Sequence, residues 1–280
     1  MLKIAWVTDS SACINEELQH HPDVYVVPIT IIFDNQEYRD GVDLTPYELY
    51  SKLKSSISKP KTSQPSVGQF QALYEKLQYS YDYIISIHVS SKLSGTYSSS
   101  FQAAQQIQKP IYVIDSKVTS YPMTALISEG IRLNGAGTEI KDVVSSIQKL
   151  VDKNKMYVIV GSLEQLYASG RLNSIQFVVG SLLKIKPIIT FNNGTLAIYD
   201  KVRSERKALH RFLTILKEEV QHSTISEVYL LYGLRSDKAQ VLKQKIESLF
   251  PSLNVLTYPF STSLGVHTGE DTIGISWFNN

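Results

Sequence analysis

The first half of the chain alternates short apolar runs with segments whose apolar residues recur at helical spacing. The apolar runs, interpreted as strands, lie at residues 3–7, 24–33, 83–89 and 110–115. The predicted helices lie at residues 70–77, 97–107, 119–133 and 141–152, with one more helix start at residues 45–48. Residues 37–43 are polar and are expected to be irregular. This alternation predicts a doubly wound α/β domain with a mainly parallel sheet covered on both faces.

The second half has a different order of elements. Its predicted strands lie at residues 156–160, 186–191, 195–202, 227–232, 254–258 and 272–277. Its predicted helices are short pieces within residues 163–182 and longer segments at residues 206–220 and 237–249. Asn192, Asn193 and Gly194 stand between two strands and predict a β-hairpin. We therefore expect an N-terminal domain at residues 1–155 and a C-terminal α/β domain with antiparallel pairing at residues 156–280, whose last strand can pair in either domain.

The composition narrows the class of protein. The chain has 280 residues, which suits two domains, and 43% of them are apolar, enough for a substantial core. A net charge of +2 without a long basic block argues against nucleic acid as a partner. The single cysteine, Cys13, excludes a disulfide within the chain, and the histidines lack metal-site spacing, so no metal is expected. No run approaches the ~20 apolar residues of a membrane span, so we expect a soluble cytoplasmic protein.

Two loops rich in hydroxyl side chains carry the most informative chemistry. They are TSQPS at residues 62–66 and SSKLSGTY at residues 90–97, and each leads into a predicted helix. Hydroxyl groups and free backbone N–H groups at the positive end of a helix can hold a small anion without a metal. Serine and threonine are also the usual N-caps, so helix capping alone is the alternative interpretation of either loop. Two such loops in one α/β pattern favour a shared site.

Polar residues also follow three of the predicted parallel strands. Residues 8–11, 90–95 and 115–116 all come directly after a strand. Because sites in doubly wound sheets lie past the carboxyl ends of the strands, these segments are expected to share one edge of the first domain. Asp9 and Asp115 end two of the strands and are expected to hold N–H groups of the loops.

Five side chains are candidates for chemistry at that edge. Ser94 is a nucleophile only if a base lies beside it. His88 lies within a strand and is expected to be a core or edge histidine. His267 lies in a glycine-flanked loop and is a better candidate than His88 for reaching the site, and the alternative is a surface histidine. Arg171 either neutralises an anion or caps a helix, and Arg203 is interpreted as part of a solvated basic face.

Taken together and in this order, these segments resemble the DegV family over nearly the whole chain. The matching segments are TDSSA at residues 8–12, YRDGVD at 38–43, TSQPS at 62–66, SSKLSGTY at 90–97, DS at 115–116, GR at 170–171, IKPI at 185–188, the Arg/Lys stretch at 202–208 and the glycine–histidine segment at 265–272. Two segments depart from the family pattern. Cys13-Ile14 replaces Asp-Leu, and Gly269-Glu270-Asp271 replaces Gly-Pro-Gly, which adds two carboxylates beside His267.

The resemblance implies a two-domain α/β protein that binds one long-chain fatty acid, such as palmitate or oleate, and that catalyses no reaction and needs no cofactor. The carboxylate is implied to lie where the domains meet, with the acyl chain buried. The residues implied to hold or approach the carboxylate are Thr62, Ser94, Ser63, Gly95, Thr96, His267 and Arg171. A separate fatty acid kinase subunit, implied to contact Arg203, phosphorylates the bound acid to an acyl phosphate that is used in phospholipid synthesis.

Two other functions fit some of these residues. One is a serine hydrolase or acyltransferase that uses Ser94 with His267, although the sequence places no base beside Ser94. The other is a phosphosugar- or nucleotide-binding module that uses the same two loops. The chain has no dinucleotide fingerprint, no phosphate-loop Gly-Lys-Ser/Thr sequence and no G-x-S-x-G elbow.

Overall fold

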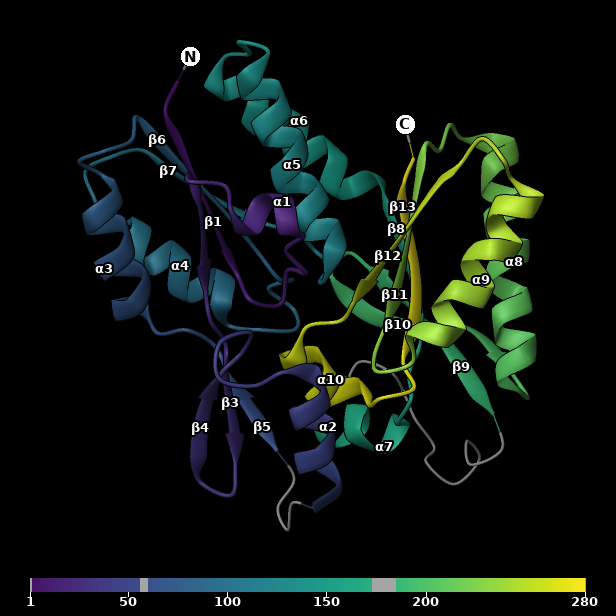
Figure 1. Cartoon of the computed structure of the whole chain (residues 1–280). Coiled ribbons are helices and arrows are strands. Elements are labelled where there is room, and N and C mark those ends of the chain that lie inside the picture. The colour runs from purple at the N-terminus through teal and green to yellow at the C-terminus, as the bar shows by residue number, and fades with distance from the viewer. Residues whose placement is uncertain (1, 56–59, 173–184, 280) are drawn as a thin grey trace.

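Two β-sheets stand side by side with helices between them, and a third, small sheet lies at one end (Figure 1). A computed structural model describes residues 2–55, 60–172 and 185–279. The first sheet has the strand order β2-β1-β6-β7, and all of its pairs are parallel. Its strands are β1 (Ile4–Asp9), β2 (Val24–Val27), β6 (Tyr83–His88) and β7 (Ile111–Asp115).

Helices cover both faces of this sheet (Figure 1). They are α3 (Val67–Leu77) and α4 (Thr96–Ala104) on one face, with α5 (Tyr121–Gly135), α6 (Ile140–Lys153) and the short α1 (Glu16–Gln19) on the other. Successive side chains of a strand point to opposite faces. In β1, Ala5 and Val7 therefore pack with α3 and α4, whereas Trp6 packs in the cluster that contains α5 and α6.

The second sheet is mixed and has the strand order β10-β9-β8-β13-β11-β12. Its strands are β8 (Asn154–Ile159), β9 (Lys186–Asn192), β10 (Thr195–Val202), β11 (Glu227–Tyr232), β12 (Asn254–Pro259) and β13 (Ile273–Phe278). Only β11 and β12 pair in parallel. Helices α8 (Glu205–His222) and α9 (Ser236–Leu249) cover its outer face. This arrangement confirms the predicted fold class, and the last strand, β13, lies between β8 and β11.

The inner face of the second sheet shares a core with the first sheet. Ile87 of β6, Leu126 and Ile127 of α5, and Met156 and Tyr229 of the second sheet belong to one buried cluster. Helix α5 contacts both β6 and β11. The space between the sheets is therefore apolar, which suits it to an apolar ligand.

The small sheet corrects three predictions. The apolar run at residues 24–33 is predicted as one strand, but it divides at Pro28 into β2 and β3 (Thr30–Phe33). Residues predicted as irregular form β4 (Gln36–Arg39), because Asp34 and Asn35, with φ of 46° and 66°, make the left-handed two-residue turn of a hairpin. The third strand is β5 (Lys61–Ser63), so Thr62 lies on a strand and not in a loop.

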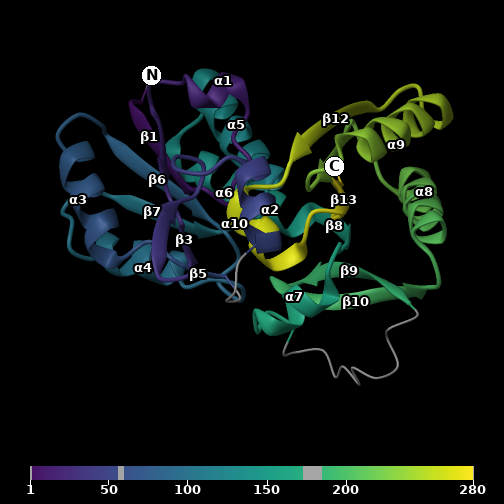
Figure 2. The same ribbon diagram turned by 60° about the horizontal axis from the view of Figure 1, so that its bottom comes forward.

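Two helices pack beside the small sheet, and a third packs on one of them. They are α2 (Pro46–Ser55), α7 (Leu163–Ala168) and α10 (Thr262–Thr268). Both Figure 1 and the turned view in Figure 2 show α10 beside α2, and α10 also contacts α7. Of the short helices predicted within residues 163–182, α7 is present, and the part from residue 173 onward lies outside the described residues.

Candidate functional site

A cavity of about 580 Å³ lies between the two sheets at the carboxyl edge of the first. One part of its wall consists of hydroxyl-bearing and basic side chains, among them Thr62, Ser94, Arg171 and His267. The rest is mainly apolar and is lined by Ile29, Val89, Leu93, Met156, Val158, Val160, Leu166, Ile189, Phe191, Leu196, Phe260 and Leu264. Its volume falls in the range of about 300–1,000 Å³ that is usual for small-molecule sites. The cavity thus combines a polar end with an apolar body.

The two hydroxyl-rich loops meet at the polar end of the cavity. A Cβ atom built on Gly95 would lie 2.9 Å from Nε2 of Gln64, so the loop that follows β5 is in close contact with the loop that follows β6. Ser94 Oγ lies 2.9 Å from Thr96 Oγ1 and accepts a hydrogen bond from the Thr96 N–H at 3.3 Å. Thr62 reaches the same cavity from the small sheet. These contacts bring together loops that are far apart in the sequence.

His267 bonds to Thr62 inside this cavity. Its Nε2 lies 2.8 Å from Thr62 Oγ1. Burial, with a smaller contribution from the positive charge of Arg171, lowers the pKa of His267 from 6.5 to about 3. The imidazole is therefore neutral near pH 7, and it can donate or accept one hydrogen bond without contributing charge.

The expectation that His267 lies in a loop is wrong. It lies in the last turn of α10, which Ser261 begins by accepting a hydrogen bond from the Leu264 N–H. Gly269, with φ of 84°, is the residue after the helix, the position where glycine commonly ends one. The flanking glycine is therefore a stop signal for a short helix.

Arg171 supplies the positive charge at this end of the cavity. Its Nη1 donates to the carbonyl of Ser169 at 2.6 Å, and its Nε donates to the carbonyl of Leu93 at 3.4 Å. Burial lowers the pKa of the guanidinium. Among the described residues, no carboxylate lies at ion-pair distance from Arg171. Its charge is thus directed at the Ser94 loop and is available to an anionic ligand.

Two other candidates have side chains that do not line the cavity. Ser63 is exposed on the small sheet, next to Thr62. Thr96 is fully buried and touches the site only through Ser94. Sequence reasoning missed Gln64, Lys92 and Thr119, which line the cavity. Gln64 and Lys92 lie inside the two predicted loops, whereas Thr119 had no signal beyond its position after β7.

The expected edge of the first sheet is present and is held by two aspartates. Asp9 accepts hydrogen bonds from the N–H groups of Ser11 and Val89, each at 3.0 Å. Asp115 accepts from the N–H groups of Ser91 at 3.2 Å and Lys117 at 2.9 Å. Both aspartates therefore hold loop N–H groups at the carboxyl ends of strands, as predicted.

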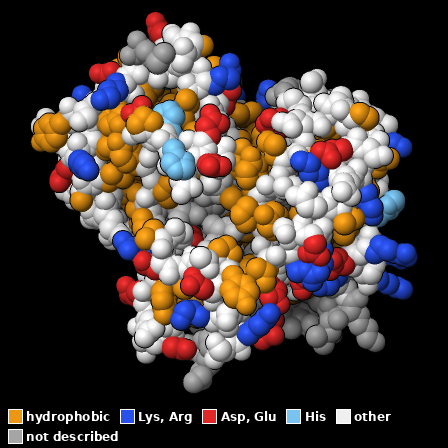
Figure 3. Space-filling view, in the orientation of Figure 1, with side chains coloured by type: hydrophobic (Ala, Val, Ile, Leu, Met, Phe, Trp, Pro, Cys, Tyr) orange, Lys and Arg blue, Asp and Glu red, His pale blue; other side chains and the backbone are white. Residues whose placement is uncertain are grey.

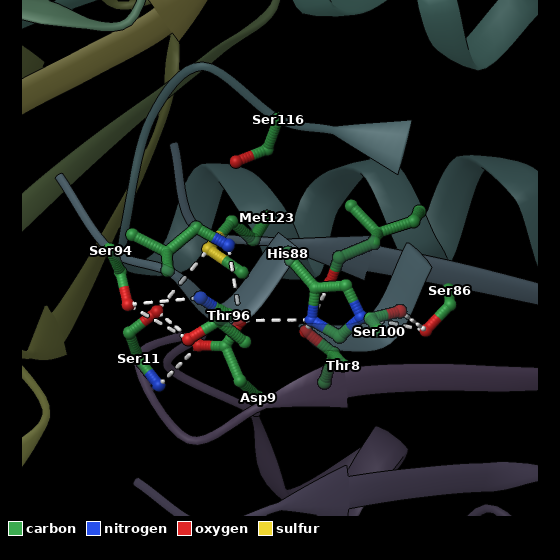
Figure 4. Close-up of polar contacts among 12 residues, drawn as sticks. Thr8, Asp9, Ser11, Ser86, His88, Ser94, Thr96, Ser100, Ser116 and Met123 are labelled. Atoms are coloured by element: carbon green, nitrogen blue, oxygen red, sulfur yellow. Dashed lines mark hydrogen bonds and ion pairs between the residues drawn. The ribbon is translucent and has the colours of Figure 1, made fainter. Parts of the chain in front are cut away.

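Behind this edge, three buried side chains are hydrogen-bonded in the same Ser-His-Asp order as a catalytic triad. Ser86 Oγ lies 2.7 Å from His88 Nε2, and His88 Nδ1 lies 3.0 Å from Asp9 Oδ2 (Figure 4). Ser86 also bonds to Tyr74, and all three members are fully buried. None of them lines the cavity, so no substrate can reach Ser86. His88 is thus a core histidine, one of its two predicted roles.

The two carboxylates that depart from the family pattern point away from the cavity. Glu270 pairs with Lys54 of α2 at 2.9 Å, and Asp271 pairs with Lys238 of α9 at 3.1 Å. Neither residue lines the cavity. The two ion pairs connect the segment after His267 to the surrounding helices and leave the polar end of the cavity free of added negative charge.

No helix within residues 2–55, 60–172 and 185–279 is both long and apolar enough to cross a membrane. In the same part of the chain, no three His, Cys, Asp or Glu side chains come together as ligands for a metal ion.

Comparisons with known proteins give relatives that match the whole chain. A sequence model described as an uncharacterised protein family, DegV, matches residues 3–280. A DegV domain-containing protein of Halalkalibacterium halodurans is 36% identical over 281 residues, which is 99% of each chain. Protein DegV of Bacillus subtilis is 32% identical over 279 residues, again 99% of each chain.

Solved structures show the same architecture. A fatty acid binding DegV family protein from Streptococcus agalactiae superposes with a TM-score of 0.93 at 29% identity, over 100% of each chain. A DegV family protein from Thermus thermophilus, whose structure was reported for its fatty acid binding, superposes with a TM-score of 0.92 at 28% identity, also over 100% of each chain.

Proposed function

This chain belongs to the DegV family, and from that premise we propose that it binds one long-chain fatty acid in the cavity between its sheets. One observation carries the proposal: the cavity has hydroxyl groups, a neutral histidine and an arginine at one end and mainly apolar side chains elsewhere. A molecule with a small anionic head and a long apolar tail matches both parts. Palmitate and oleate are ligands of this kind.

The apolar body of the cavity is expected to supply most of the affinity. Burial of roughly 15 methylene groups at about 0.8 kcal/mol each gives on the order of 12 kcal/mol before the costs of binding. A hydrogen bond to a charged group contributes about 1.5–3 kcal/mol. The tail therefore determines how tightly the ligand binds, and the polar end determines which way it points.

The carboxylate is expected to lie beside Thr62 and Ser94. Their hydroxyl groups donate to it, His267 keeps its bond with Thr62, and Arg171 partly balances the negative charge. Hydroxyl donors hold a carboxylate less tightly than a bidentate guanidinium clamp would. The head group therefore remains a nucleophile that can accept a phosphoryl group.

We further propose that the bound acid is presented to the catalytic subunit of a fatty acid kinase, and that the acyl phosphate serves phospholipid synthesis. Arg203 is exposed just before α8, away from the residues that line the cavity, which suits a contact with a partner. Arg203→Ala is expected to leave fatty acid binding unchanged and to slow phosphorylation by the purified kinase subunit. Lys207→Ala, a second exposed cation nearby, is the matched control. Loss of fatty acid binding in Arg203→Ala would instead assign Arg203 to the pocket or the fold.

Native mass spectrometry of the protein purified from bacteria tests the binding proposal. The expected result is one acyl chain per protein, which delipidated protein takes up again from palmitate or oleate. Delipidated protein that binds neither acid would contradict the proposal. Hydrolysis of an ester, abolished in Ser94→Ala, would favour a hydrolase. Displacement of the lipid by sugar phosphates would favour the phosphosugar- or nucleotide-binding module.

A further inference from the structure

A second cavity, of about 360 Å³, lies between α5 and the second sheet. Its lining includes apolar and aromatic side chains, namely Tyr121, Ala125, Leu150, Tyr229 and Phe278. It also includes the charged side chains of Glu129, Arg132 and Glu227. In Figure 3 the surface is hollowed at the top between the two lobes, and hydrophobic side chains gather along the hollow. This cavity shares no lining residue with the one that holds Thr62 and His267.

Three aromatic side chains of one buried cluster, Phe260, Tyr121 and Tyr258, are associated with the walls of the two cavities. Phe260 lines the first cavity, Tyr121 lines the second, and Tyr258 lines neither. The rings of Tyr121 and Tyr258 stack with centroids 3.6 Å apart and an interplanar angle of 9°, and their hydroxyl groups are 3.0 Å apart. Tyr258 lies in β12 and Phe260 directly follows that strand, and both belong to the buried cluster between the sheets.

The ring of Phe260 lies over a glycine of β13, the strand on the far side of β11 from β12. A Cβ atom built on Gly274 of β13 would lie 3.2 Å from Phe260 Cζ and 3.5 Å from Leu231 Cβ. The ring therefore occupies the space that a side chain at position 274 would fill. Phe260 is 5% exposed, so it is packed on its other sides as well.

We propose that Phe260, Tyr258 and Tyr121 form an aromatic partition that limits the length of the acyl chain, an inference that rests on the proposed function. Protein interiors are close-packed, so a methylene group cannot enter the volume that a seated ring occupies. A chain that fills the first cavity stops at Phe260. Without the partition, a longer chain would continue toward Tyr229 in the second cavity.

Competition between palmitate and the longer saturated acid behenate tests the partition. Delipidated wild type, Phe260→Ala and Phe260→Ala with Tyr258→Ala are each offered both acids, and native mass spectrometry gives the ratio bound. Each further buried methylene group tightens binding about fourfold. The behenate-to-palmitate ratio should therefore rise by about fourfold or more in Phe260→Ala and rise again in the double variant. Only the double variant is expected to bind a fatty acid that ends in a pyrene ring.

The controls separate this inference from the function on which it rests. Phe250→Ala removes a partly buried ring on the outer face of the same sheet and should leave the ratio unchanged. Phe260→Leu, which keeps an apolar side chain, replaces Phe260→Ala if that variant does not fold, and should shift the ratio in the same direction. Wild type that binds palmitate, with the same ratio in every variant, overturns the partition alone. Wild type that binds neither acid overturns the proposed function.

Discussion

Two histidines in this protein bond to hydroxyl side chains, and they differ in what lies beside them. His88 sits between Ser86 and Asp9 with no exposed surface, and Phe70 lies edge-on to its ring at a centroid distance of 5.0 Å. His267 bonds to Thr62 and faces a cavity of about 580 Å³. Their hydrogen bonds have similar lengths, 2.7 Å and 2.8 Å.

The comparison shows that hydrogen-bond order alone does not identify a site. Ser86, His88 and Asp9 have the sequence of contacts of a Ser-His-Asp triad, yet the side chains around them are packed and leave no room for a substrate. His267 has a simpler set of contacts, but its ring is neutral and borders open space. Access to open space is therefore the property that separates these two histidines.

The largest effect is expected when the buried network is broken. Asp9→Ala leaves His88 and the N–H groups of Ser11 and Val89 without an acceptor, so it should lower the free energy of unfolding by about 3–5 kcal/mol. Urea denaturation measures this, with Asp152→Ala as the control, because Asp152 forms an exposed ion pair whose loss costs about 1 kcal/mol or less. Equal losses in the two variants would show that the network is not structural.

The next effect concerns the ligand and not the fold. Thr62→Val and Ser94→Ala each remove a hydroxyl donor expected at the carboxylate, which should weaken palmitate binding about 10- to 150-fold, equivalent to about 1.5–3 kcal/mol. Titration calorimetry on delipidated protein gives the affinities. Ser63→Ala, beside Thr62 but exposed, is the matched control. Unchanged affinity and unchanged kinase turnover in the double variant would remove both residues from the site.

His267 should also give the protein a specific dependence on pH. Its pKa is lowered from 6.5 to about 3, so the unfolded chain binds the proton more readily than the folded one between these values. Stability is therefore lost as the pH falls below 6.5. Between pH 7 and pH 5, His267 should account for a loss of about 2 kcal/mol that His267→Gln lacks, as measured by urea denaturation at both pH values. Identical losses in wild type and variant would show that the imidazole is solvated.

Local sequence signals predicted the fold class, but not how strands are shared between sheets. Asn193 and Gly194 indicated the β9–β10 hairpin, and both adopt the positive φ that such a turn needs. Residues 24–33, in contrast, contain two strands that pair in different sheets. Their apolar pattern is the same on both sides of Pro28, and pairing partners are determined by tertiary packing, so one chain segment does not reveal the split.

The candidate site was predictable as two loops, but not as one end of a closed cavity. The hydroxyl residues of both loops marked the polar end, because N–H and hydroxyl donors at helix starts are a local feature. The bond between Thr62 and His267 spans 205 positions of sequence and depends on α10 packing against β5. The neutral state of His267 depends on burial by residues from several elements, which no local pattern contains.

The smallest effect is expected from the two carboxylates that follow His267. Glu270 and Asp271 form partly exposed ion pairs with Lys54 and Lys238. Such pairs contribute about 0–1 kcal/mol, so Glu270→Gln with Asp271→Asn should change the free energy of unfolding by no more than about 1–2 kcal/mol. Because both side chains point away from the cavity, palmitate affinity should stay within about twofold of wild type, a difference of about 0.4 kcal/mol. A tighter complex in the double variant would mean that these carboxylates repel the ligand, and that His267 shares its end of the cavity with negative charge.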